Sequence, residues 1–393
     1  LAEQLRAQVG TDRAPGLADR EAKGVADAAG ARGTEERGGA LALLGARQGE
    51  SKPGLRPAHG QIRSDATPLL HQPHAAVSIM KAAMAKVENK PTKGPAATGL
   101  LPDDRLRELF REMLLIRRFE EKVEERFRAG ELPGFLHVCI GQEAIASGVM
   151  AALEPDDVIA STHRAHGHTI AKGTHVNAVM AELYGKSEGC SHGYGGSMHL
   201  YDIAQGNLGA NAVVGGGLPA VVGAALAFQF RKQERVAVAF FGDGATNTGT
   251  FHESLNLAQL WRVPALFVLE MNGWAESTPM SQHLPIEDLS QRAVAFGMRS
   301  VEVDGQDVEA VYAATREARE HARSGKGPVF LNVRTYRLVG HYIGDPQVYR
   351  EKDEVDELRE AMDPIGLLRA RLELSDEQLE ALETEIEAIV EGS

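Results

Sequence analysis

The stretch from Val236 to Trp274 most constrains the fold, because it reads as a strand, a helix and a second strand in succession. Val236 to Phe241 is a short run of β-branched, small and aromatic residues, which is typical of a buried strand. Residues 250–261 have the apolar spacing of a helix, and 265–269 form a second apolar run. A helix that joins two strands in this way makes a right-handed crossover, so the strands should be parallel neighbours.

Polar residues follow both of these strands. Asp243 ends the first strand within a Gly-Asp-Gly turn, and Asn272 follows the second. Glycines in such a turn permit unusual backbone angles and a close approach of a ligand. Since parallel strands end at one edge of a sheet, both side chains should lie at the ligand-binding edge, where their oxygens would suit Mg²⁺ and a diphosphate. Taken alone, the tripeptide is more simply interpreted as an ordinary turn, so the metal interpretation depends on the rest of the chain.

A second candidate site is the histidine-rich segment 162–173, which follows a predicted strand at 158–161. It places three histidines around one arginine, at His163, Arg164, His166 and His168. Histidines are common zinc ligands, but the segment has no carboxylate or cysteine, and Arg164 would add a fixed positive charge. An anion site fits better, because a guanidinium can clamp phosphate oxygens beside imidazole donors. A phosphate site, a metal site and purely structural histidines all remain open.

A long glycine-rich segment, residues 185–217, precedes the first strand of the Val236 unit. It contains little that predicts regular structure, and a loop of that length inside a compact domain is usually functional. Its glycines either let backbone amides approach a ligand or simply mark a surface loop. Two further histidines fall in loops elsewhere, His137 and His341.

The rest of the folded region alternates helices with strands. A helix capped by Asp103 or Asp104 should run to Gly130. Further helices are expected at 142–153, 218–230, 286–296 and 308–324, and further strands at 300–303 and 328–336. The acidic tail should be helical, with helix starts at Asp363-Pro364 and at Ser375 with Gln378. The expected fold class is therefore α/β, with a doubly wound and mostly parallel sheet.

Residues 1–98 differ from the rest, and we predict a disordered extension followed by one domain at 99–393. The extension has no aromatic residue and no hydrophobic periodicity, so it cannot offset its ordering entropy by burying apolar surface. Its acidic residues argue against a transit peptide. The sequence begins with Leu1, whereas Met80 and Met84 lie shortly before the first helical pattern. We expect the region upstream of Met80 not to belong to the natural product.

Charge and cysteine content limit the classes of partner. The 42 basic and 55 acidic residues give a formal net charge of −13, which argues against a nucleic acid or an anionic membrane as a partner. No apolar run approaches the ~20 residues of a transmembrane helix. Two cysteines, Cys139 and Cys190, argue against a disulfide framework and fit a reducing compartment, so a cytoplasmic location is expected.

Four motifs in a fixed order give the chain a specific resemblance. They are Gly242-Asp243-Gly244 with Asn272, His163-Arg164-Ala165-His166-Gly167, Gly195-Gly196-Ser197-Met198-His199 and Gly340-His341. From about Asp103 to Val390 the chain resembles the alpha subunits of the thiamine-diphosphate-dependent 2-oxo acid dehydrogenase and acetoin dehydrogenase family. Pyruvate and branched-chain 2-oxo acid dehydrogenases share all four motifs, while 161–173 and 249–258 are more similar to the acetoin dehydrogenase branch.

The resemblance implies a thiamine-diphosphate-binding fold and a set of site residues. Mg²⁺ would be held by Asp243, the side chain of Asn272 and the main-chain carbonyl of Trp274. His163 and Arg164 would contact the cofactor diphosphate, with amides from Gly244 and Ala245. Main-chain groups around Ala212 and Val214 would face the aminopyrimidine. His137 and His341 would line the reacting centre, where His341 also contacts the cofactor.

The resemblance also implies partners. In this family the glutamate that activates the pyrimidine comes from a beta subunit, and no glutamate of this chain can be assigned that role. The expected assembly is therefore an α₂β₂ heterotetramer, which passes its product to a lipoyl domain of an acyltransferase component. The substrate would be pyruvate or acetoin, or alternatively a branched-chain 2-oxo acid. Two readings from other classes are a non-catalytic assembly relative and a metal-dependent hydrolase built on the histidine cluster.

Three positions depart from the family pattern. Met271 replaces the first of two asparagines in the fingerprint, which puts the local packing in question. Ala212 replaces a common glycine and requires a backbone angle that suits alanine. Tyr342 stands where animal pyruvate dehydrogenases carry a regulatory serine, so control by phosphorylation is not expected at this position.

Overall fold

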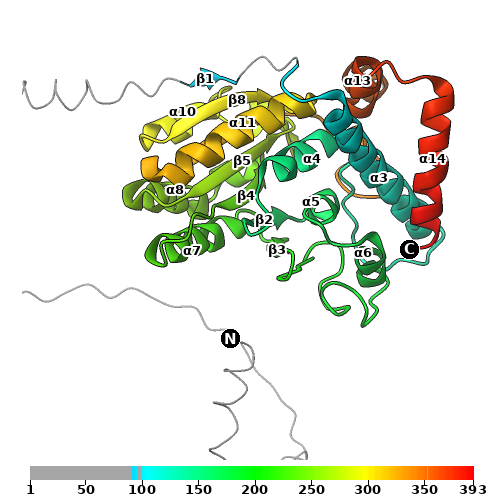
Figure 1. Ribbon diagram of the computed structural model, residues 1–393, viewed down its shortest axis with the longest axis horizontal. Coiled ribbons are helices and arrows are strands. Elements are labelled where there is room, and N and C mark those ends of the chain that lie inside the picture. The colour runs from blue at the N-terminus through cyan, green and yellow to red at the C-terminus, as the bar shows by residue number, and fades with distance from the viewer. Residues whose placement is uncertain (1–90, 95–98, 352) are drawn as a thin grey trace, which may run out of the picture. The chain divides into compact units, whose positions relative to one another are not determined.

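A seven-stranded parallel sheet forms the centre of the structure (Figure 1). The computed structural model describes residues 91–94, 99–351 and 353–393, which belong to one compact unit. In spatial order the strands are β1 (Thr92–Lys93), β8 (Arg299–Asp304), β9 (Val329–Arg334), β5 (Ala265–Met271), β4 (Ala237–Gly242), β2 (Val158–Thr162) and β3 (Asn207–Asn211). All neighbouring strands of this sheet pair in parallel, so the predicted α/β fold class is confirmed.

The two strands of the Val236 unit lie side by side at the centre of this sheet. β4 and β5 pair in continuous register from Ala237 with Ala265 to Gly242 with Glu270. Helix α8 (Gly249–Trp261) makes the crossover between them, as predicted. β5 extends two residues beyond the predicted run, and this extension brings Glu270 and Met271 to the edge of the sheet.

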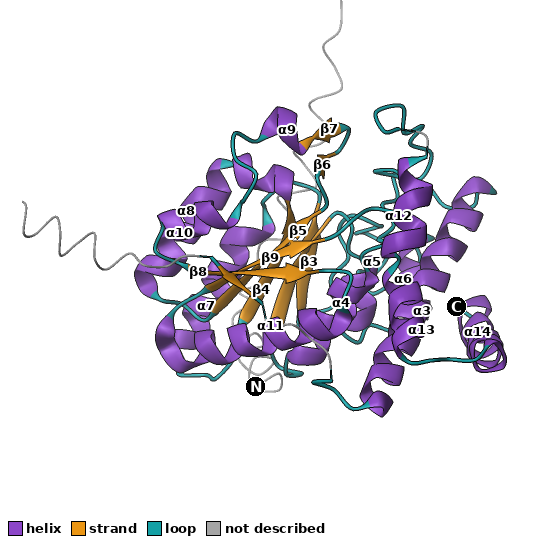
Figure 2. Cartoon of the chain, turned by 90° about the horizontal axis from the view of Figure 1, so that it is seen from above, coloured by secondary structure: helices purple, strands orange, loops and turns teal. Residues whose placement is uncertain are grey.

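Helices cover both faces of the sheet (Figure 2). α7 (Gly217–Phe230), α8 and α10 (Ser290–Ala295) pack on one face, and α4 (Glu143–Ala152) and α11 (Val308–His321) pack on the other. Successive strand residues alternate between these layers, so Phe241 packs with the first set of helices and Phe240 with the second. Burial on both faces explains why the central strands are almost entirely apolar.

The direction of the chain across the sheet reverses between β2 and β4. From β2 the chain passes outward to the edge strand β3, and α7 then returns it across β2 to β4. The connections that leave β2 and β4 therefore diverge, and a crevice opens beyond their carboxyl ends. Such a switch point is where open α/β sheets bind ligands.

A further helical layer packs against α4. It consists of α3 (Asp103–Arg128), α5 (His166–Ala171), α6 (Val176–Leu183), α13 (Pro364–Arg371) and α14 (Asp376–Glu391). Arg117 connects α3 to α4 and to the start of α13, because its Nε donates to Glu143 of α4 (2.5 Å) and its two terminal nitrogens donate to Asp363 (3.0 Å each). Asp363 in turn caps the start of α13.

Several local predictions are confirmed and others are wrong. Asp363-Pro364 and Ser375 with Gln378 start helices as predicted, the latter as a complete capping box. The predicted cap at Asp103 or Asp104 is wrong, because Pro102 precedes α3 and the aspartates occupy its first turn, where their charge favours the helix dipole. The helix expected at 286–296 is reduced to α10.

Some elements were not predicted. They are α5, α6, β3, the hairpin of β6 (Trp274–Ala275) and β7 (Thr278–Pro279), α9 (Met280–His283) and the short helical turn η1 (Asp243–Asn247). The helix predicted at 308–324 is divided into α11 and the short helical turn η2 (Ala322–Lys326). In the acidic tail, α12 (Glu354–Met362) is helical as expected. Most of these missed elements are short or glycine-rich, so they carry little hydrophobic periodicity.

Most of the predicted disordered extension lies outside the described residues, as do Met80, Met84 and the proposed start of the chain. Residues 91–94 differ from the prediction, because Thr92 and Lys93 add strand β1 to the open edge of β8. The amide of Gly94 continues this pairing by donating to the carbonyl of Glu302 (2.7 Å). Within the described ranges no helix is long and apolar enough to cross a membrane.

The ion pair between Arg117 and Asp363 predicts a pH-dependent stability. Burial alone would raise the pKa of Asp363, but the hydrogen bonds and charge of Arg117 hold it below its usual value of about 3.9. The carboxylate therefore stabilises the fold above that value, and this stabilisation is lost as the pH falls through the lowered pKa. Asp363→Asn keeps a good helix cap and removes the charge, so its melting temperature should lie below that of the wild type at pH 7.

The difference in melting temperature should shrink as the pH approaches 3. Thermal unfolding of both proteins between pH 7 and pH 3, followed by circular dichroism, measures it. A difference of the same size at both ends of this range would show that the charge of Asp363 is not responsible.

Candidate functional site

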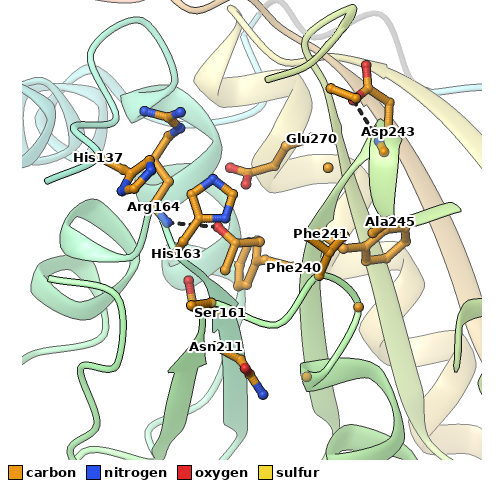
Figure 3. Close-up of a pocket in the computed structure, with 18 of the residues that line it drawn as sticks. His137, Ser161, His163, Arg164, Asn211, Phe240, Phe241, Asp243, Ala245 and Glu270 are labelled. Carbon is orange, nitrogen blue, oxygen red and sulfur yellow. Dashed lines mark hydrogen bonds between the residues drawn. The ribbon is translucent and has the colours of Figure 1, made fainter. Parts of the chain in front are cut away.

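A cavity of about 450 Å³ lies at the switch point, beyond the carboxyl ends of β2 and β4. All eleven residues predicted for the site line it: His137, His163, Arg164, Ala212, Val214, Asp243, Gly244, Ala245, Asn272, Trp274 and His341. Figure 3 shows His137, His163 and Arg164 on one side of the cavity and Asp243 on the other, with Glu270 between them. The fold thus brings together residues from six separate segments of the chain.

Asp243 lies directly after β4, and the two oxygens of its carboxylate differ in their hydrogen bonding. Its Oδ1 accepts the amide of Gly244 (2.8 Å), whereas the buried Oδ2 has no hydrogen-bond partner among the described residues. Burial raises the pKa of Asp243 above its ordinary value. A buried carboxylate oxygen without a partner is costly, and a bound cation would compensate for it.

Asn272 and the departures from the family pattern fit this edge of the sheet. Asn272 accepts the amide of Trp274 through its side-chain oxygen (3.1 Å), across the positive-φ residue Gly273. Met271, at the end of β5, packs partly buried against the apolar layer of α7 and α8, so methionine fits where relatives carry asparagine. Ala212 has no positive φ, and its backbone therefore suits alanine.

The rings of His137, His163 and His341 form a cluster on the opposite wall. Their centroids lie 4.7 Å (His137 to His163), 4.9 Å (His137 to His341) and 5.2 Å (His163 to His341) apart. Burial, followed by the charge of Arg164, lowers the pKa of His137 to about 2 and those of His163 and His341 to about 3. All three imidazoles are therefore neutral at neutral pH and can each donate one hydrogen bond and accept another.

Arg164 connects the two loops that carry His137 and His341. One terminal nitrogen donates to the carbonyl of Val138, and the other donates to the carbonyl of His341 (2.8 Å). These bonds use two of the five N–H groups of a guanidinium. Burial lowers the pKa of Arg164, but an arginine keeps its charge, so it brings a fixed cation to the cavity.

Arg337 is a cavity residue that the sequence did not single out. Its Nη1 bonds to Nδ1 of His341 (2.9 Å) and its Nη2 donates to the carbonyl of Glu276 (2.9 Å). A guanidinium only donates, so Nδ1 of His341 accepts and the neutral ring carries its proton on Nε2. Burial, followed by Arg164 and Arg350, lowers the pKa of Arg337 to about 10. Its position four residues before His341, in the same loop, could have indicated from the sequence that Arg337 lies near the cavity.

Of the predicted histidine cluster, only His163 reaches the cavity. His166 lies between Glu120 (2.6 Å) and Ser197 (2.8 Å), and His168 lies between Glu270 (3.1 Å) and Ser161 (2.8 Å). Both are buried and lie in helix α5, which begins after Ala165. The segment therefore contributes Arg164 and one imidazole to the cavity, and its other two histidines have internal partners.

The structure does assemble three histidines whose nitrogens lie within 4.8 Å of one another, namely His137, His163 and His341. Zinc requires Zn–N distances of about 2.0–2.1 Å and electron pairs free of other bonds. Here Nδ1 of His341 already accepts from Arg337, and two guanidinium cations lie against the cluster. Their charges repel a metal ion and attract an anion, so this wall fits a phosphate group better than zinc.

Comparison with known proteins identifies the family. A family model described as the dehydrogenase E1 component matches residues 111–393. The alpha subunit of acetoin:2,6-dichlorophenolindophenol oxidoreductase from Bacillus subtilis (strain 168) is 49% identical over 257 residues, which are 65% of this chain and 77% of the relative. The subunit of the same name from Cupriavidus necator is 43% identical over 295 residues, 74% of this chain and 89% of the relative.

Pyruvate dehydrogenases are also similar. The E1 component alpha subunit of pyruvate dehydrogenase from Rhizobium meliloti (strain 1021) is 42% identical over 323 residues, 81% of this chain and 92% of the relative. The chain belongs to the dehydrogenase E1 component family and is an oxidoreductase of this type. This confirms the thiamine-diphosphate-dependent dehydrogenase family that the four motifs indicated.

The lowered pKa values of the three histidines predict how stability depends on pH. Unfolded histidines take up protons near pH 6.5, whereas these imidazoles remain neutral in the fold down to about pH 3. Stability should therefore fall as the pH drops from about 6.5 towards 3. His163→Asn removes one such group, so its melting temperature should fall less steeply over this range than that of the wild type.

His192→Asn is the matched control for this measurement. His192 is exposed and has a positive φ that asparagine tolerates, so the slope should match that of the wild type. Thermal unfolding at half-unit steps of pH compares the three proteins. Equal slopes for His163→Asn and the wild type would show that His163 is not neutral in the fold.

Proposed function

We propose that this chain is the alpha subunit of a thiamine-diphosphate- and Mg²⁺-dependent dehydrogenase component that acts on pyruvate or acetoin together with a beta subunit. The observation that carries the proposal is the opposition of charges within one cavity. A buried carboxylate oxygen, to which none of the described residues bonds, faces two buried guanidinium groups and three neutral imidazoles. A metal-bound diphosphate would complement both walls at once.

Asp243, the side chain of Asn272 and the main-chain carbonyl of Trp274 would hold the metal. The free Oδ2 of Asp243 is the ligand atom that supports this role. His163 and Arg164 would bind the diphosphate, together with the amide of Ala245. The amide of Gly244 donates to Asp243 in this structure, so it would reach the phosphate only when that carboxylate turns to the metal. Main-chain groups near Ala212 and Val214 would contact the aminopyrimidine.

The bound cofactor would supply the nucleophilic carbon and the electron sink that cleavage next to a carbonyl requires. The chain's own contribution is orientation and proton placement. With Nδ1 accepting from Arg337, His341 presents its Nε2–H as a donor, and this group would stabilise negative charge on a substrate oxygen. His137 lies beside it as a neutral imidazole. The negative charge of a bound diphosphate would oppose the burial and the charge of Arg164 that lower its pKa, so His137 could then exchange a proton.

A beta subunit would complete the site. Three carboxylates line the cavity. Asp243 belongs to the proposed metal site, Glu270 is bonded to the buried His168, and Glu276 is exposed in the turn between β6 and β7. Apolar residues at the cavity mouth are exposed, since Val213 is 70% and Val214 52% accessible, and Tyr194 in the glycine-rich segment is 91% accessible. These side chains fit a surface that a partner covers, and an α₂β₂ assembly would supply the missing glutamate.

The relatives are named for acetoin and for pyruvate, and a branched-chain 2-oxo acid is the remaining substrate class. The product would pass to the lipoyl domain of an acyltransferase component. A non-catalytic relative is less compatible with the cavity, because a chain without a ligand gains nothing from burying Arg164, Arg337 and an unpaired oxygen of Asp243.

The assembled enzyme provides the direct test. The chain is co-expressed with a beta subunit, and turnover of pyruvate, acetoin and a branched-chain 2-oxo acid is measured with an artificial electron acceptor. Activity that requires both thiamine diphosphate and Mg²⁺, with pyruvate or acetoin as the best substrate, is the expected result. An assembled enzyme that binds the cofactor but converts none of the three substrates would refute the proposal.

Asp243→Asn tests the metal site within this assembly. Loss of a metal ligand should weaken Mg²⁺-dependent binding of thiamine diphosphate by about 100-fold or more, since even changes beyond the ligands cost 10- to 100-fold. The melting temperature without cofactor should stay equal or rise, because burial already disfavours the charge of Asp243. Isothermal titration calorimetry measures the binding.

Asp156→Asn serves as the control, because its side chain is 65% exposed just before β2, at the opposite end of the strands. It should bind the cofactor as the wild type does. Wild-type affinity in Asp243→Asn would remove Asp243 from the metal site.

A further inference from the structure

A buried chain of hydrogen bonds runs behind the cavity wall that carries His137. Glu120 of α3 bonds to Nδ1 of His166 (2.6 Å), and Nε2 of His166 bonds to the hydroxyl of Ser197 (2.8 Å). Glu120 and His166 are fully buried, and Ser197 is 9% accessible. A carboxylate accepts hydrogen bonds, so the proton of the His166 ring that faces Glu120 lies on Nδ1.

Glu120 has a second partner that links this chain to His137. Its other oxygen accepts the backbone amide of Cys139 (2.8 Å), two residues beyond His137. His166 is followed by Gly167, where an added Cβ would lie 2.7 Å from the sulfur of Cys139. Glu120 and the α5 backbone therefore hold Cys139 from two directions.

His137 needs such support, because its ring has few hydrogen bonds of its own. Its buried Nδ1 has no hydrogen-bond partner among the residues that the structure describes. The flanking backbone bonds to other loops, since Leu136 accepts from Ile343 (3.0 Å) and Ile140 accepts from Leu338 (3.1 Å). Glu120 is the contact that attaches this segment to a long helix, α3, which is more rigid than a loop.

The Ser197 end of this chain of hydrogen bonds is also held firmly. The glycine-rich segment before Ser197 wraps around the buried carboxylate of Glu182, which accepts four backbone amides. These are the amides of Ser191 (2.9 Å), Gly193 (2.8 Å), Gly195 (2.7 Å) and Gly196 (3.0 Å). Glu120 lies on α3 and Ser197 follows the segment that Glu182 holds, so both partners of His166 are fixed. The ring of His166 therefore has one defined orientation.

The order carboxylate, imidazole, hydroxyl also occurs in hydrolases that use a serine nucleophile. That role requires a substrate to reach the hydroxyl. Ser197 does not line the cavity, although its neighbour Met198 does, and the imidazole is completely buried. The arrangement therefore fits support for the cavity wall better than a second catalytic centre.

We propose that Glu120 and His166 are positioning residues that hold the Cys139 backbone, and through it His137, at the reacting centre. This inference rests on the proposed function, in which His137 handles a proton at that centre. It assigns a role to Glu120 that depends on an oxygen acceptor at this position and does not require a negative charge. Displacement of a catalytic group by about 1 Å can cost 100-fold in rate, so loss of the acceptor should lower turnover without weakening cofactor binding.

The test compares two substitutions at Glu120 in the assembled alpha–beta enzyme. Glu120→Gln keeps an oxygen that can accept from Cys139, whereas Glu120→Met has nearly the same shape and no acceptor. We expect Glu120→Met to lower kcat roughly 10- to 100-fold, with half-saturation by thiamine diphosphate within about 3-fold of wild type. Glu120→Gln should retain most of the wild-type kcat.

Asp157→Leu is the matched control for Glu120→Met. Asp157 is also fully buried and also bridges a backbone amide, that of Val236 (2.8 Å), and a basic side chain, Arg319 (2.6 Å). It lies at the opposite ends of the strands from the cavity. Its loss should lower the melting temperature and leave kcat unchanged.

Substitutions at His166 provide a second comparison in case Glu120→Met does not fold. In His166→Asn the amide nitrogen takes the place of Nδ1 and keeps the bond to Glu120. In His166→Gln the amide takes the place of Nε2 and loses that bond. His166→Asn should therefore keep a higher kcat than His166→Gln, and the reverse order would overturn the proposal.

Hydrogen–deuterium exchange gives a readout that does not depend on activity. Exchange of the segment 136–140 should be faster in Glu120→Met than in the wild type and in Glu120→Gln. Unchanged exchange overturns the proposal, even if the wild-type enzyme converts none of the three substrates and the proposed function fails. Faster exchange with unchanged kcat, an equal loss of kcat in Asp157→Leu, or labelling of Ser197 by a fluorophosphonate would also overturn it.

Discussion

The bond pair made by Arg164 is the interaction on which the site depends. One guanidinium joins the carbonyl of Val138, beside His137, to the carbonyl of His341, so two loops that are distant in sequence form one wall. Since a guanidinium is planar and rigid, it also sets the separation of the two carbonyls. Burial is the main cause of the lowered pKa values of the neighbouring imidazoles, and the charge of Arg164 is the next. Arg164 therefore contributes both to the structure of this wall and to its electrostatics.

Each wall of the cavity buries charged groups at a cost in free energy, cations on one wall and a carboxylate on the other. On one side, burial and then the charge of Arg164 lower the pKa values of His137 and His163. On the other, Asp243 keeps an oxygen that has no hydrogen-bond partner in the described part of the chain. Neither wall gains from this arrangement in the free protein, and each would be stabilised by the part of a metal-bound diphosphate that faces it. Functional sites can keep such unfavourable electrostatic interactions in the free protein because the bound ligand relieves them.

The sequence predicted what depends on local pattern and missed what depends on side-chain direction. The unit of β4, α8 and β5 has clear periodicity, and its polar ends were placed at the sheet edge correctly. The histidines of 163–168 looked like one cluster, yet α5 turns two of them inward, and His163 instead meets His137 and His341 from other segments. Such a meeting requires the fold. β3 was missed because glycine and asparagine hide a strand within a loop-like composition.

The carboxylate of Glu182 changes how the glycine-rich segment should behave when a partner arrives. By composition this segment has much conformational freedom to lose, and a flexible loop at an interface lowers affinity by the entropy of its ordering. Four amides bound to one buried carboxylate have already removed that freedom between Ser191 and Gly196. The segment can therefore present its exposed side chains as a preformed template, and subunit assembly need not wait for it to fold.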